Sequence, residues 1–431
     1  MADIIHPKVL IISDCDFHHG KDATAITVRN IFDKWPSERL SFIQLMSYNN
    51  SLSTVSGKFI LDSQHLKYGN LLMKIRKNQS KVTNDTPALI VEKNSNKKQK
   101  LKHVFRIGLA ASADMLSYKI SSELIEFIEK EKPEIIYVLP YGRRIIKLAL
   151  DIHRRFNIPL LPHFMDDWPS TIYNDSTITS LQRKFTLKSL NNLLKVSEKS
   201  LVISDAMKKE FKKRYKKSQF FSLMNDVEEY AAKDIDLEYI TKNKLSLCYA
   251  GGLHLNRWTS LLTICNLMQK MDRIERLDIY TSERDWQEIK EYFKKFHFIK
   301  YKGFIDQKKV LDTLNNYDCL VFIESFDENI KKYTKFSIST KIPEYLSLGK
   351  PIIAIGPSDI ASINYLNENN LAIVCNNTNE DECKAILKED LSNTKMLRKK
   401  IDNGKIIFFK NHYRKVQHEK FLEILSSLLN Y

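Results

Sequence analysis

The chain has 431 residues, which is too long for one ordinary hydrophobic core and suits two domains of roughly 200 residues each. Hydrophobic residues make up 43% and aromatic residues 10%, and glycine and proline number only 11 each, which excludes a disordered or collagen-like chain. The net charge of +16 predicts an anionic neighbour, and nucleic acid, anionic lipid and a phosphorylated substrate would all satisfy it.

Six cysteines show neither a CxxC pair nor the spacing of a metal site, and several fall in apolar, strand-like runs. The N-terminus lacks the basic and apolar regions of a signal peptide, and no apolar run is long enough to span a bilayer. We therefore expect a cytoplasmic protein that contacts the inner face of the plasma membrane at most peripherally. Lysine-rich segments at 93–102 and 208–217 would provide that contact, although a solvated surface explains them equally well.

In chain order, short apolar runs alternate with helical patterns. The first half predicts strands at 9–13, 41–45, 134–139, 159–162 and 200–204, and helices at 24–34, 117–131, 143–156, 180–195 and 206–216. After an expected linker at 226–242, strands are predicted at 245–250, 277–280, 298–301, 319–323, 351–355 and 371–374, with a helix at 257–270.

This alternation predicts an α/β protein with two Rossmann-like, doubly wound domains that face a central cleft. The first domain would cover residues 1–235, completed by a C-terminal helix within 408–431 that crosses back, and the second would cover 236–407. In such sheets ligands bind beyond the carboxyl ends of the strands, so the loops at those ends are the places to search for a site.

The segment FSISTKIPEYLSLGKP at 336–351 reads as a polar loop, a short helix and a turn before a buried strand. Ser339 or Thr340 would begin the helix, and its free backbone N–H groups beside Lys341 form a ready anion site. Glu344, one turn further on, can accept two hydrogen bonds from a sugar diol. A nucleotide fits this pattern, and ordinary helix capping without a ligand explains it about equally well.

A second pattern that suggests phosphate binding directly follows the first predicted strand of the second domain. There Gly251 and Gly252 precede a predicted helix that begins near Arg257. The absence of side chains lets the backbone approach a phosphate, and an arginine can bind that phosphate through two hydrogen bonds. A glycine pair in such a turn often serves geometry alone. Its combination with the loop that carries Lys341 and Glu344 makes the prediction stronger.

The order of these motifs resembles the GT-B glycosyltransferases, in particular the nucleotide-sugar-dependent enzymes of bacterial surface polysaccharide synthesis (glycosyltransferase family 4, group 1-like). The resemblance covers nearly the whole chain and is most specific in the second domain. It implies that Arg257 and Lys341 bind the donor diphosphate and that Glu344 binds the ribose hydroxyls. Two positions depart from the family pattern: Phe336 stands where many relatives have an acid, and Gly252 where many have a basic residue.

Candidates for contact with an acceptor lie in the first domain. His163, Asp166 and Asp167 belong to the sequence HFMDDWP at the end of a predicted strand, where they could position an acceptor hydroxyl or take its proton. Relatives of the family show a similar Asp-x-Trp-Pro element facing the cleft. Alternatively, Asp167 caps the next helix and Trp168 packs in the core.

The first strand-to-helix loop contains Gly20 and Thr24, and it resembles the family's glycine-bearing loop near the donor phosphate and the acceptor. His18 and His19 in the same loop read as surface residues rather than metal ligands, because no third ligand is apparent. One pair of aspartates is also thin support for a metal site. We predict neither a metal nor a cofactor, since the nucleotide sugar is a substrate.

Together with these motifs, the resemblance implies a hexosyltransferase-like glycosyltransferase that moves a sugar from a nucleotide-sugar donor to a hydroxyl of a lipid-linked or oligosaccharide acceptor in surface polysaccharide biosynthesis. The resemblance implies retention of anomeric configuration and no required metal. A nucleotide-sugar 2-epimerase on the same fold is the first alternative. A non-enzymatic nucleic-acid-binding protein is the second, but the chain shows neither a recognition motif nor a basic stripe with interleaved aromatics.

Overall fold

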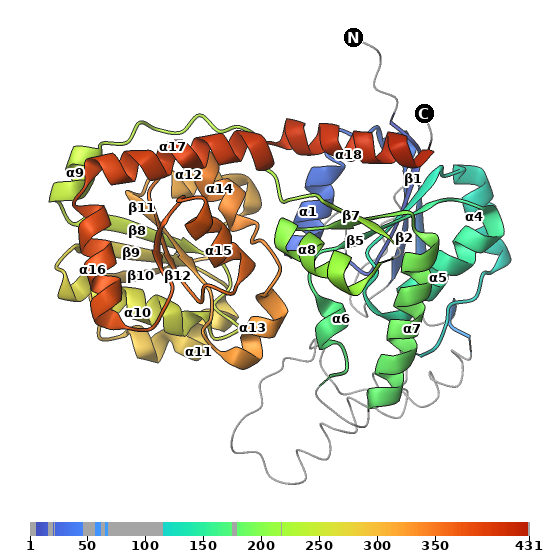
Figure 1. The fold of residues 1–431 in the computed structure, drawn as a ribbon, viewed down its shortest axis with the longest axis horizontal. Coiled ribbons are helices and arrows are strands. Elements are labelled where there is room, and N and C mark those ends of the chain that lie inside the picture. The colour runs from blue at the N-terminus through green and yellow to red at the C-terminus, as the bar shows by residue number, and fades with distance from the viewer. Residues whose placement is uncertain are drawn as a thin grey trace, which may run out of the picture. The chain divides into compact units, whose positions relative to one another are not determined.

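The computed structural model describes residues 6–15, 20, 22–45, 57–61, 65–67, 115–174, 179–216 and 218–429. The predicted basic segment at 93–102 and the residues His18 and His19 lie outside these ranges. The chain divides into two compact units (Figure 1). Unit 1 comprises Met1–Ser222 with Phe421–Tyr431, and unit 2 comprises Leu223–Lys420. Each unit is built on one parallel sheet, which confirms the predicted α/β class.

Within its described residues, unit 1 contains a seven-stranded parallel sheet in the order β3-β2-β1-β4-β5-β6-β7. Most of its strands are buried along their whole length, as expected of parallel strands in α/β proteins. The strands are β1 (Val9–Ser13), β2 (Leu40–Leu45), β3 (Lys58–Leu61), β4 (Ile135–Val138), β5 (Leu160–Phe164), β6 (Lys199–Val202) and β7 (Gln219–Ser222).

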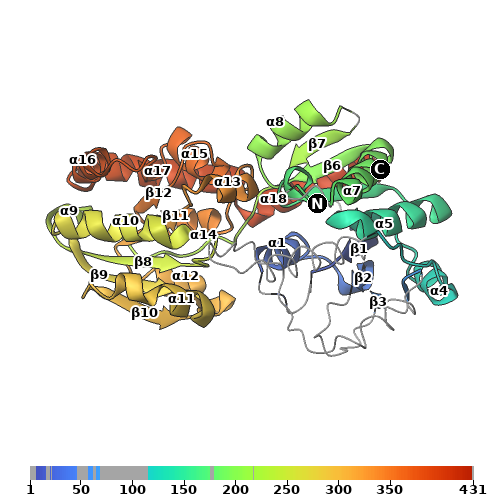
Figure 2. The same ribbon diagram turned by 90° about the horizontal axis from the view of Figure 1, so that it is seen from below.

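The helices of unit 1 largely follow the predicted ranges. Helices α5 and α7 lie side by side (Figure 2). The helices are α1 (Ala23–Ile31), a 3-10 turn at Ser37–Arg39, α4 (Ser122–Glu131), α5 (Gly142–Phe156), α6 (Trp168–Thr171), α7 (Ser180–Val196) and α8 (Asp205–Arg214).

The last helix, α18 (Arg414–Leu429), contributes its C-terminal half to unit 1. Phe421 on this helix is fully buried, and its ring lies 5.5 Å from that of Phe32, 5.7 Å from that of Trp35 and 6.2 Å from that of Tyr137. Aromatic side chains supply much of the apolar area in such clusters, so the core of unit 1 includes a residue near the C-terminus of the chain.

Unit 2 contains a six-stranded parallel sheet in the order β10-β9-β8-β11-β12-β13. Its strands all overlap predicted ones, and two of them, β8 and β11, have the predicted bounds. The strands are β8 (Leu245–Ala250), β9 (Ile274–Tyr280), β10 (Ile299–Gly303), β11 (Cys319–Ile323), β12 (Ile352–Ile355) and β13 (Ile373–Cys375).

The helices of unit 2 begin inside the segment 226–242 that the sequence predicted to be a linker. That prediction is wrong in part, because α9 buries Leu237 and Ile240 in the core of unit 2 and Val227 forms a bridge with Tyr413. The helices are α9 (Leu237–Lys242), α10 (Arg257–Lys270), α11 (Glu283–Phe293), a 3-10 turn at Gln307–Lys309, α12 (Val310–Leu314), α13 (Glu328–Thr334), α14 (Lys341–Ser347), α15 (Ala361–Glu368), α16 (Glu380–Leu391) and α17 (Thr394–Asn411).

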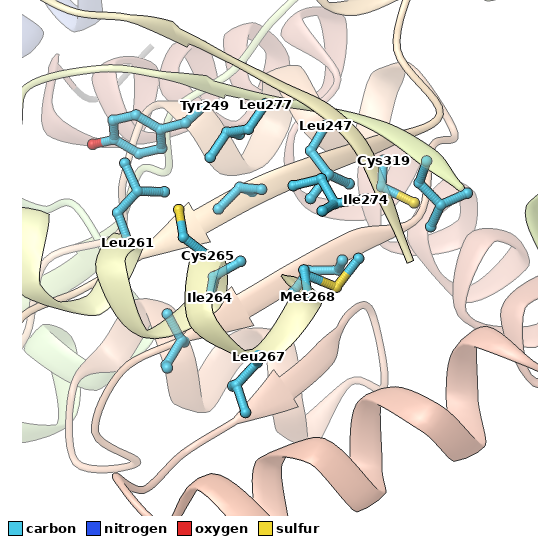
Figure 3. Close-up of a cluster of buried hydrophobic side chains, with 14 of the residues drawn as sticks. Leu247, Tyr249, Leu261, Ile264, Cys265, Leu267, Met268, Ile274, Leu277 and Cys319 are labelled. Carbon is cyan, nitrogen blue, oxygen red and sulfur yellow. The ribbon is translucent and has the colours of Figure 1, made fainter. Parts of the chain in front are cut away.

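Two hydrophobic clusters form the core of unit 2. Successive side chains of a strand point to opposite faces of the sheet, so β8 contributes Leu247 and Tyr249 to one cluster and Cys248 to the other. Figure 3 shows the first cluster, where Leu261 and Ile264 of α10 pack toward the strands. The second cluster includes residues of α14, and this packing fixes the helix that carries the predicted donor-binding residues.

The strand order reverses direction once in each sheet. In unit 1, the strands that follow β1 are added on one side of the sheet, and those that follow its neighbour β4 are added on the other side. In unit 2, β8 and β11 are the corresponding neighbouring strands. Loops at the carboxyl ends of such strands turn away from each other, and the crevice between them is where open α/β sheets bind ligands. Each unit therefore has one preferred position for a site.

Candidate functional sites in the two units

The loop between β8 and α10 has an unusual backbone. Gly251 has a φ of +150°, and Leu255 and Asn256 have φ values of +60° and +53°. Non-glycine residues seldom adopt positive φ, and such residues gather at functional sites. A Cβ atom added to Gly251 would overlap the end of the Lys341 side chain. The backbone angle favours glycine here, and the absence of a side chain leaves the space that the Lys341 ammonium group occupies.

Asp285, in the first turn of α11, holds this loop in place. One of its carboxylate oxygens accepts hydrogen bonds from the backbone N–H groups of Leu253, at 2.8 Å, and His254, at 3.3 Å. The side chain of His254 also contacts this carboxylate, and these hydrogen bonds lower the pKa of Asp285 although burial opposes the shift. Asp285 was not among the residues predicted from the sequence. Gly252 adjoins the same loop, and its carbonyl accepts a hydrogen bond from the Tyr249 hydroxyl at 2.7 Å.

Arg257 begins α10 and forms an ion pair with Glu324, which directly follows β11. Its Nε lies 3.1 Å from Oε2 of Glu324 and its Nη2 lies 3.4 Å from Oε1. Burial alone would lower the pKa of Arg257, but the attraction of Glu324 outweighs it and the pKa is raised. This pair joins the two loops at the strand-order reversal of unit 2. Glu324 was also not among the residues predicted from the sequence. Its position directly after the apolar run of β11 places it at the carboxyl end of that strand, where site residues are expected.

Lys341 is the first residue of α14, as predicted. The Ser339 hydroxyl accepts a hydrogen bond from the Lys341 backbone N–H at 3.3 Å, whereas Thr340 occupies the N-cap position without a side-chain cap bond. The Lys341 Nζ lies 5.3 Å from the centre of the Tyr249 ring. Burial, and next the positive charge of Arg257, lower the pKa of Lys341 to about 8. An anion at this position would relieve the repulsion between the two cations.

Glu344 lies one turn into α14, as the sequence predicted. Burial raises its pKa to about 7, and its Oε1 accepts a hydrogen bond of 3.2 Å from Nε2 of Gln307. The structure thus brings together Gly251, Arg257 and Lys341, with Glu344 one helical turn beyond. These groups come from two segments of unit 2, the connection between β8 and α10 and the start of α14, and they match the charge and hydroxyl groups of a nucleoside diphosphate.

Unit 1 has a cavity of about 380 Å³ at its own strand-order reversal. Residues that follow β1, β4 and β5 form its wall together with the start of α1. The lining residues are Asp14, Cys15, Asp22, Thr24, Leu139, Pro140, Tyr141, His163, Phe164, Met165, Asp166 and Trp168. Two predicted candidates, His163 and Asp166, and the loop residue Thr24 thus share one cavity, whereas Gly20 and Asp167 do not line it.

The two neighbouring aspartates have different surroundings. Asp166 lines the cavity, and its Oδ1 accepts a hydrogen bond of 3.0 Å from the Trp168 backbone N–H. Burial raises the pKa of Asp166 to about 6. Asp167 is only 3% exposed, and both of its oxygens accept hydrogen bonds of 2.8 Å from the guanidinium of Arg214. Asp167 thus occupies the N-cap position of α6 without a side-chain cap bond, and the carboxylate before it, Asp166, accepts the hydrogen bond from the first helical N–H.

His163 is buried in strand β5 with its Nδ1 2.6 Å from the hydroxyl of Tyr137. Burial lowers the pKa of His163 to about 3, so the ring is neutral at physiological pH. Asp14 faces the same cavity, and burial raises its pKa to about 6. Asp14 was not among the predicted residues, although an acid that directly follows the first strand lies, like Asp166, near the carboxyl end of a strand.

The cysteines and the other side chains that could bind a metal were compared with the requirements of a disulfide and of a metal site. All six cysteines are unpaired, and five of them are buried. In the described ranges, no three His, Cys, Asp or Glu side chains are grouped so that they could hold a metal ion. None of the described helices combines the length and the apolar character that a bilayer span needs.

Residues 247–410, which lie within unit 2, match the family model described as Glucosyltransferase 3-like, C-terminal domain. A search of the curated proteins found no match.

Solved structures of glycosyltransferases share the fold across almost the entire chain. A sucrose-phosphate synthase from Thermosynechococcus elongatus is 10% identical with a TM-score of 0.63, covering 99% of this chain and 100% of its own. The Anabaena protein HepE in complex with UDP-glucose is 14% identical with a TM-score of 0.59, covering 98% and 100%. A glycosyltransferase from Rickettsia africae is 15% identical with a TM-score of 0.56, covering 98% of each chain.

Proposed function

We propose that this chain, a glycosyltransferase of the GT-B fold, transfers a hexose from a nucleoside diphosphate sugar to a hydroxyl of a lipid-linked or oligosaccharide acceptor in surface polysaccharide biosynthesis. One observation carries the proposal: Lys341 and Arg257 converge on the loop at Gly251, and Glu344 follows one helical turn later. The UDP-glucose complex of HepE, which shares the fold, supports a nucleotide-sugar donor.

The donor site would act mainly on the leaving diphosphate. Negative charge develops on the diphosphate as the glycosidic bond breaks, and cations already held in place stabilise that charge without further rearrangement. Lys341 and Arg257 would supply the positive charge, and Gly251 would let the phosphate approach the backbone. With two protein cations in this role, we propose a reaction that requires neither a metal nor a cofactor. We propose retention of the anomeric configuration from the resemblance to the family alone.

The acceptor would bind in unit 1. Asp166 lines the cavity and can accept a hydrogen bond from the attacking hydroxyl. Asp167 was an equal candidate from the sequence, but both of its oxygens are bound to Arg214. We therefore propose Asp166 as the residue that orients the acceptor and Asp167 as a residue that stabilises the surrounding fold.

UDP is expected to raise the melting temperature of the protein, because a ligand that binds only the native state stabilises it by mass action. Comparison with 2′-deoxy-UDP tests the role of Glu344 directly. UDP should stabilise the wild type more than 2′-deoxy-UDP does, and Glu344→Gln should reduce that difference, because the neutral amide accepts a ribose hydroxyl less strongly.

Glu328→Gln is the matched control, since Glu328 is an exposed residue of α13 paired with Lys331. Thermal shift assays with UDP, 2′-deoxy-UDP and other nucleoside diphosphates provide the measurement. The absence of any shift with every nucleotide would reject a donor site in unit 2. An unchanged preference for UDP in Glu344→Gln would remove only the ribose assignment.

We further propose that unit 1 contacts the anionic inner face of the plasma membrane from the cytoplasm. Helix α8 carries four lysines, at 208, 209, 212 and 213, and the exposed face of α7 adds Leu181, Lys184, Phe185 and Lys188. Helix α7 has no acidic residue, and Leu181 is 59% exposed. Lysines beside exposed apolar side chains suit the surface of an anionic bilayer.

Substitution of the four α8 lysines by glutamine is expected to weaken binding to vesicles that contain phosphatidylglycerol, since each lysine near an anionic surface contributes about 1 kcal/mol. Cosedimentation with vesicles at several salt concentrations measures the effect. The control replaces Lys384 and Lys388, which lie on α16 of unit 2. Equal binding of the α8 variant and the wild type would contradict the membrane contact.

A further inference from the structure

Two nitrogen-bearing side chains lie against the pair of glycines that follows β8. A Cβ atom on Gly251 would overlap the end of the Lys341 side chain. A Cβ atom on Gly252 would overlap Cε1 and Nδ1 of the His254 ring. The neighbouring glycines thus leave space for an ammonium group and for an imidazole ring. The proposed donor site includes Lys341 and does not include His254, although both side chains lie against the same turn.

Asp285 fixes the orientation of the His254 ring. Its Oδ2 lies 3.3 Å from Nδ1 of the ring and also accepts hydrogen bonds from the backbone N–H groups of Leu253 and His254. The hydrogen bond with the His254 side chain is the main cause that lowers the pKa of Asp285, so the carboxylate is ionised at pH 7 and can only accept. Nδ1 therefore carries a hydrogen, and Nε2 of the neutral ring carries a lone pair.

Nε2 is the side of the ring that is open to a ligand. The His254 side chain is 62% exposed, whereas that of Asp285 is 13% exposed. Among the residues that the structure describes, none pairs with Nε2. The oxygen atoms of a diphosphate accept hydrogen bonds, so Nε2 can pair with one of them only when it too carries a hydrogen. The ring would then be an imidazolium between two anions.

We infer that His254, as an imidazolium, donates a hydrogen bond from Nε2 to the diphosphate of the sugar donor, beside Lys341 and Arg257. The inference rests on the proposed function, because it adds a third group to the proposed donor site. The ring takes its second proton from the solvent as the diphosphate binds, so binding is coupled to proton uptake. Asp285 is a positioning residue, since it holds Nδ1 and leaves Nε2 for the ligand.

Proton uptake makes the affinity for a diphosphate depend on pH. The contribution of His254 should be fully present below the ordinary histidine pKa of about 6.5, and it should disappear as the pH rises past the higher pKa of a ring beside a bound diphosphate. Other groups in and around the donor site also carry charge or titrate, so the effect is measured as a ratio of two affinities at each pH. These groups are Tyr249 of β8, Arg257 of α10 with its partner Glu324, Asp285 of α11, and Lys341 and Glu344 of α14.

The first test is calorimetry of the full chain with UDP and with inorganic pyrophosphate from pH 6 to pH 9. His254→Gln should bind both ligands about tenfold more weakly than the wild type at pH 6, the usual effect of one hydrogen bond from a charged group, and equally well at pH 9. His254→Arg keeps a cation at every pH and should bind both ligands more tightly than His254→Gln at pH 9. His297→Gln is the matched control, because His297 is an exposed histidine shortly before β10.

The results separate this inference from the proposed function. Wild-type affinity for UDP in His254→Gln at every pH would overturn the role of His254 and leave the donor site intact. An equal loss of affinity at every pH, with a lower melting temperature of the free protein, would reduce His254 to a support of the loop and would also overturn the inference. Failure of the wild type to bind either ligand would reject the donor site, and the inference with it.

Nitrogen-15 NMR of the histidine rings tests the protonation of His254 in the unaltered chain. The His254 signals are identified by their absence from the spectrum of His254→Gln. At pH 8 without a ligand, the ring should carry its hydrogen on Nδ1, and saturation with pyrophosphate at pH 7 should convert it to an imidazolium. A free ring with its hydrogen on Nε2, or a ring whose protonation does not respond to pyrophosphate, would refute the assignment.

Discussion

Lys341→Ala is expected to lower the rate of sugar transfer by about 10²- to 10³-fold, the range found when one preorganised group that stabilises developing negative charge is removed. The same substitution should not lower the melting temperature. Burial, and next the charge of Arg257, hold the pKa of Lys341 in the folded protein at about 8, below the ordinary lysine value of 10.5. A lysine with a depressed pKa destabilises the fold at pH values below 8, and this cost disappears as the pH rises toward 10.5.

The comparison with Arg257→Ala makes this prediction specific. Removal of Arg257 leaves Glu324 buried without its partner, so that variant should lose both activity and thermal stability. Lys335→Ala is the control, since Lys335 is an exposed residue shortly before the same helix. Initial rates with a nucleotide-sugar donor and melting curves at pH 7 provide the measurements. Normal transfer by Lys341→Ala would refute the proposed role of the lysine.

Asp167→Ala is expected to reduce the free energy of unfolding by about 3 kcal/mol, the cost of removing one partner from a buried ion pair. Asp167 is 3% exposed and Arg214 25% exposed, and two hydrogen bonds of 2.8 Å join them. The remaining contact of Arg214 with Glu210, at 2.7 Å, limits the loss. Urea denaturation measures the change.

The neighbouring carboxylate should respond differently. Asp166→Ala removes a capping hydrogen bond, for which the usual cost is about 1 kcal/mol, and should abolish most of the transfer activity. Adjacent residues would then divide into one that mainly supports activity and one that mainly supports the fold. Equal losses of stability in the two variants would show that the structure assigns Asp167 too large a role.

The sheet of unit 2 could be predicted almost entirely from the sequence because its strands are continuous apolar runs separated by turn signals. In unit 1 the strands β3 and β7 were missed. Their sequences, KFIL and QFFS, are short and only partly buried, so they lack the signal on which the prediction depends. The doubly wound order followed from the alternation of strands and helices, which leaves few alternatives for a parallel sheet.

The helix that carries the proposed donor-binding residues was predicted because its pattern is local. Ser339, Lys341 and Glu344 belong to one short helix whose start is readable from sequence. Pairs that join distant segments were not predicted: Arg257 and Glu324 are 67 positions apart, and Asp167 and Arg214 are 47 apart. Nothing in the sequence near Asp167 reveals that an arginine occupies both of its oxygens, which is why it appeared equivalent to Asp166.

The placement of Phe421 among Phe32, Trp35 and Tyr137 has a consequence for biosynthesis. Domains commonly fold in the order in which they leave the ribosome. Unit 1 cannot complete its aromatic core in that way, because one ring of the core is translated only after all of unit 2. Nascent chains must therefore leave the core of the first unit incomplete until Phe421 has been translated, and a premature stop codon within unit 2 would damage both units.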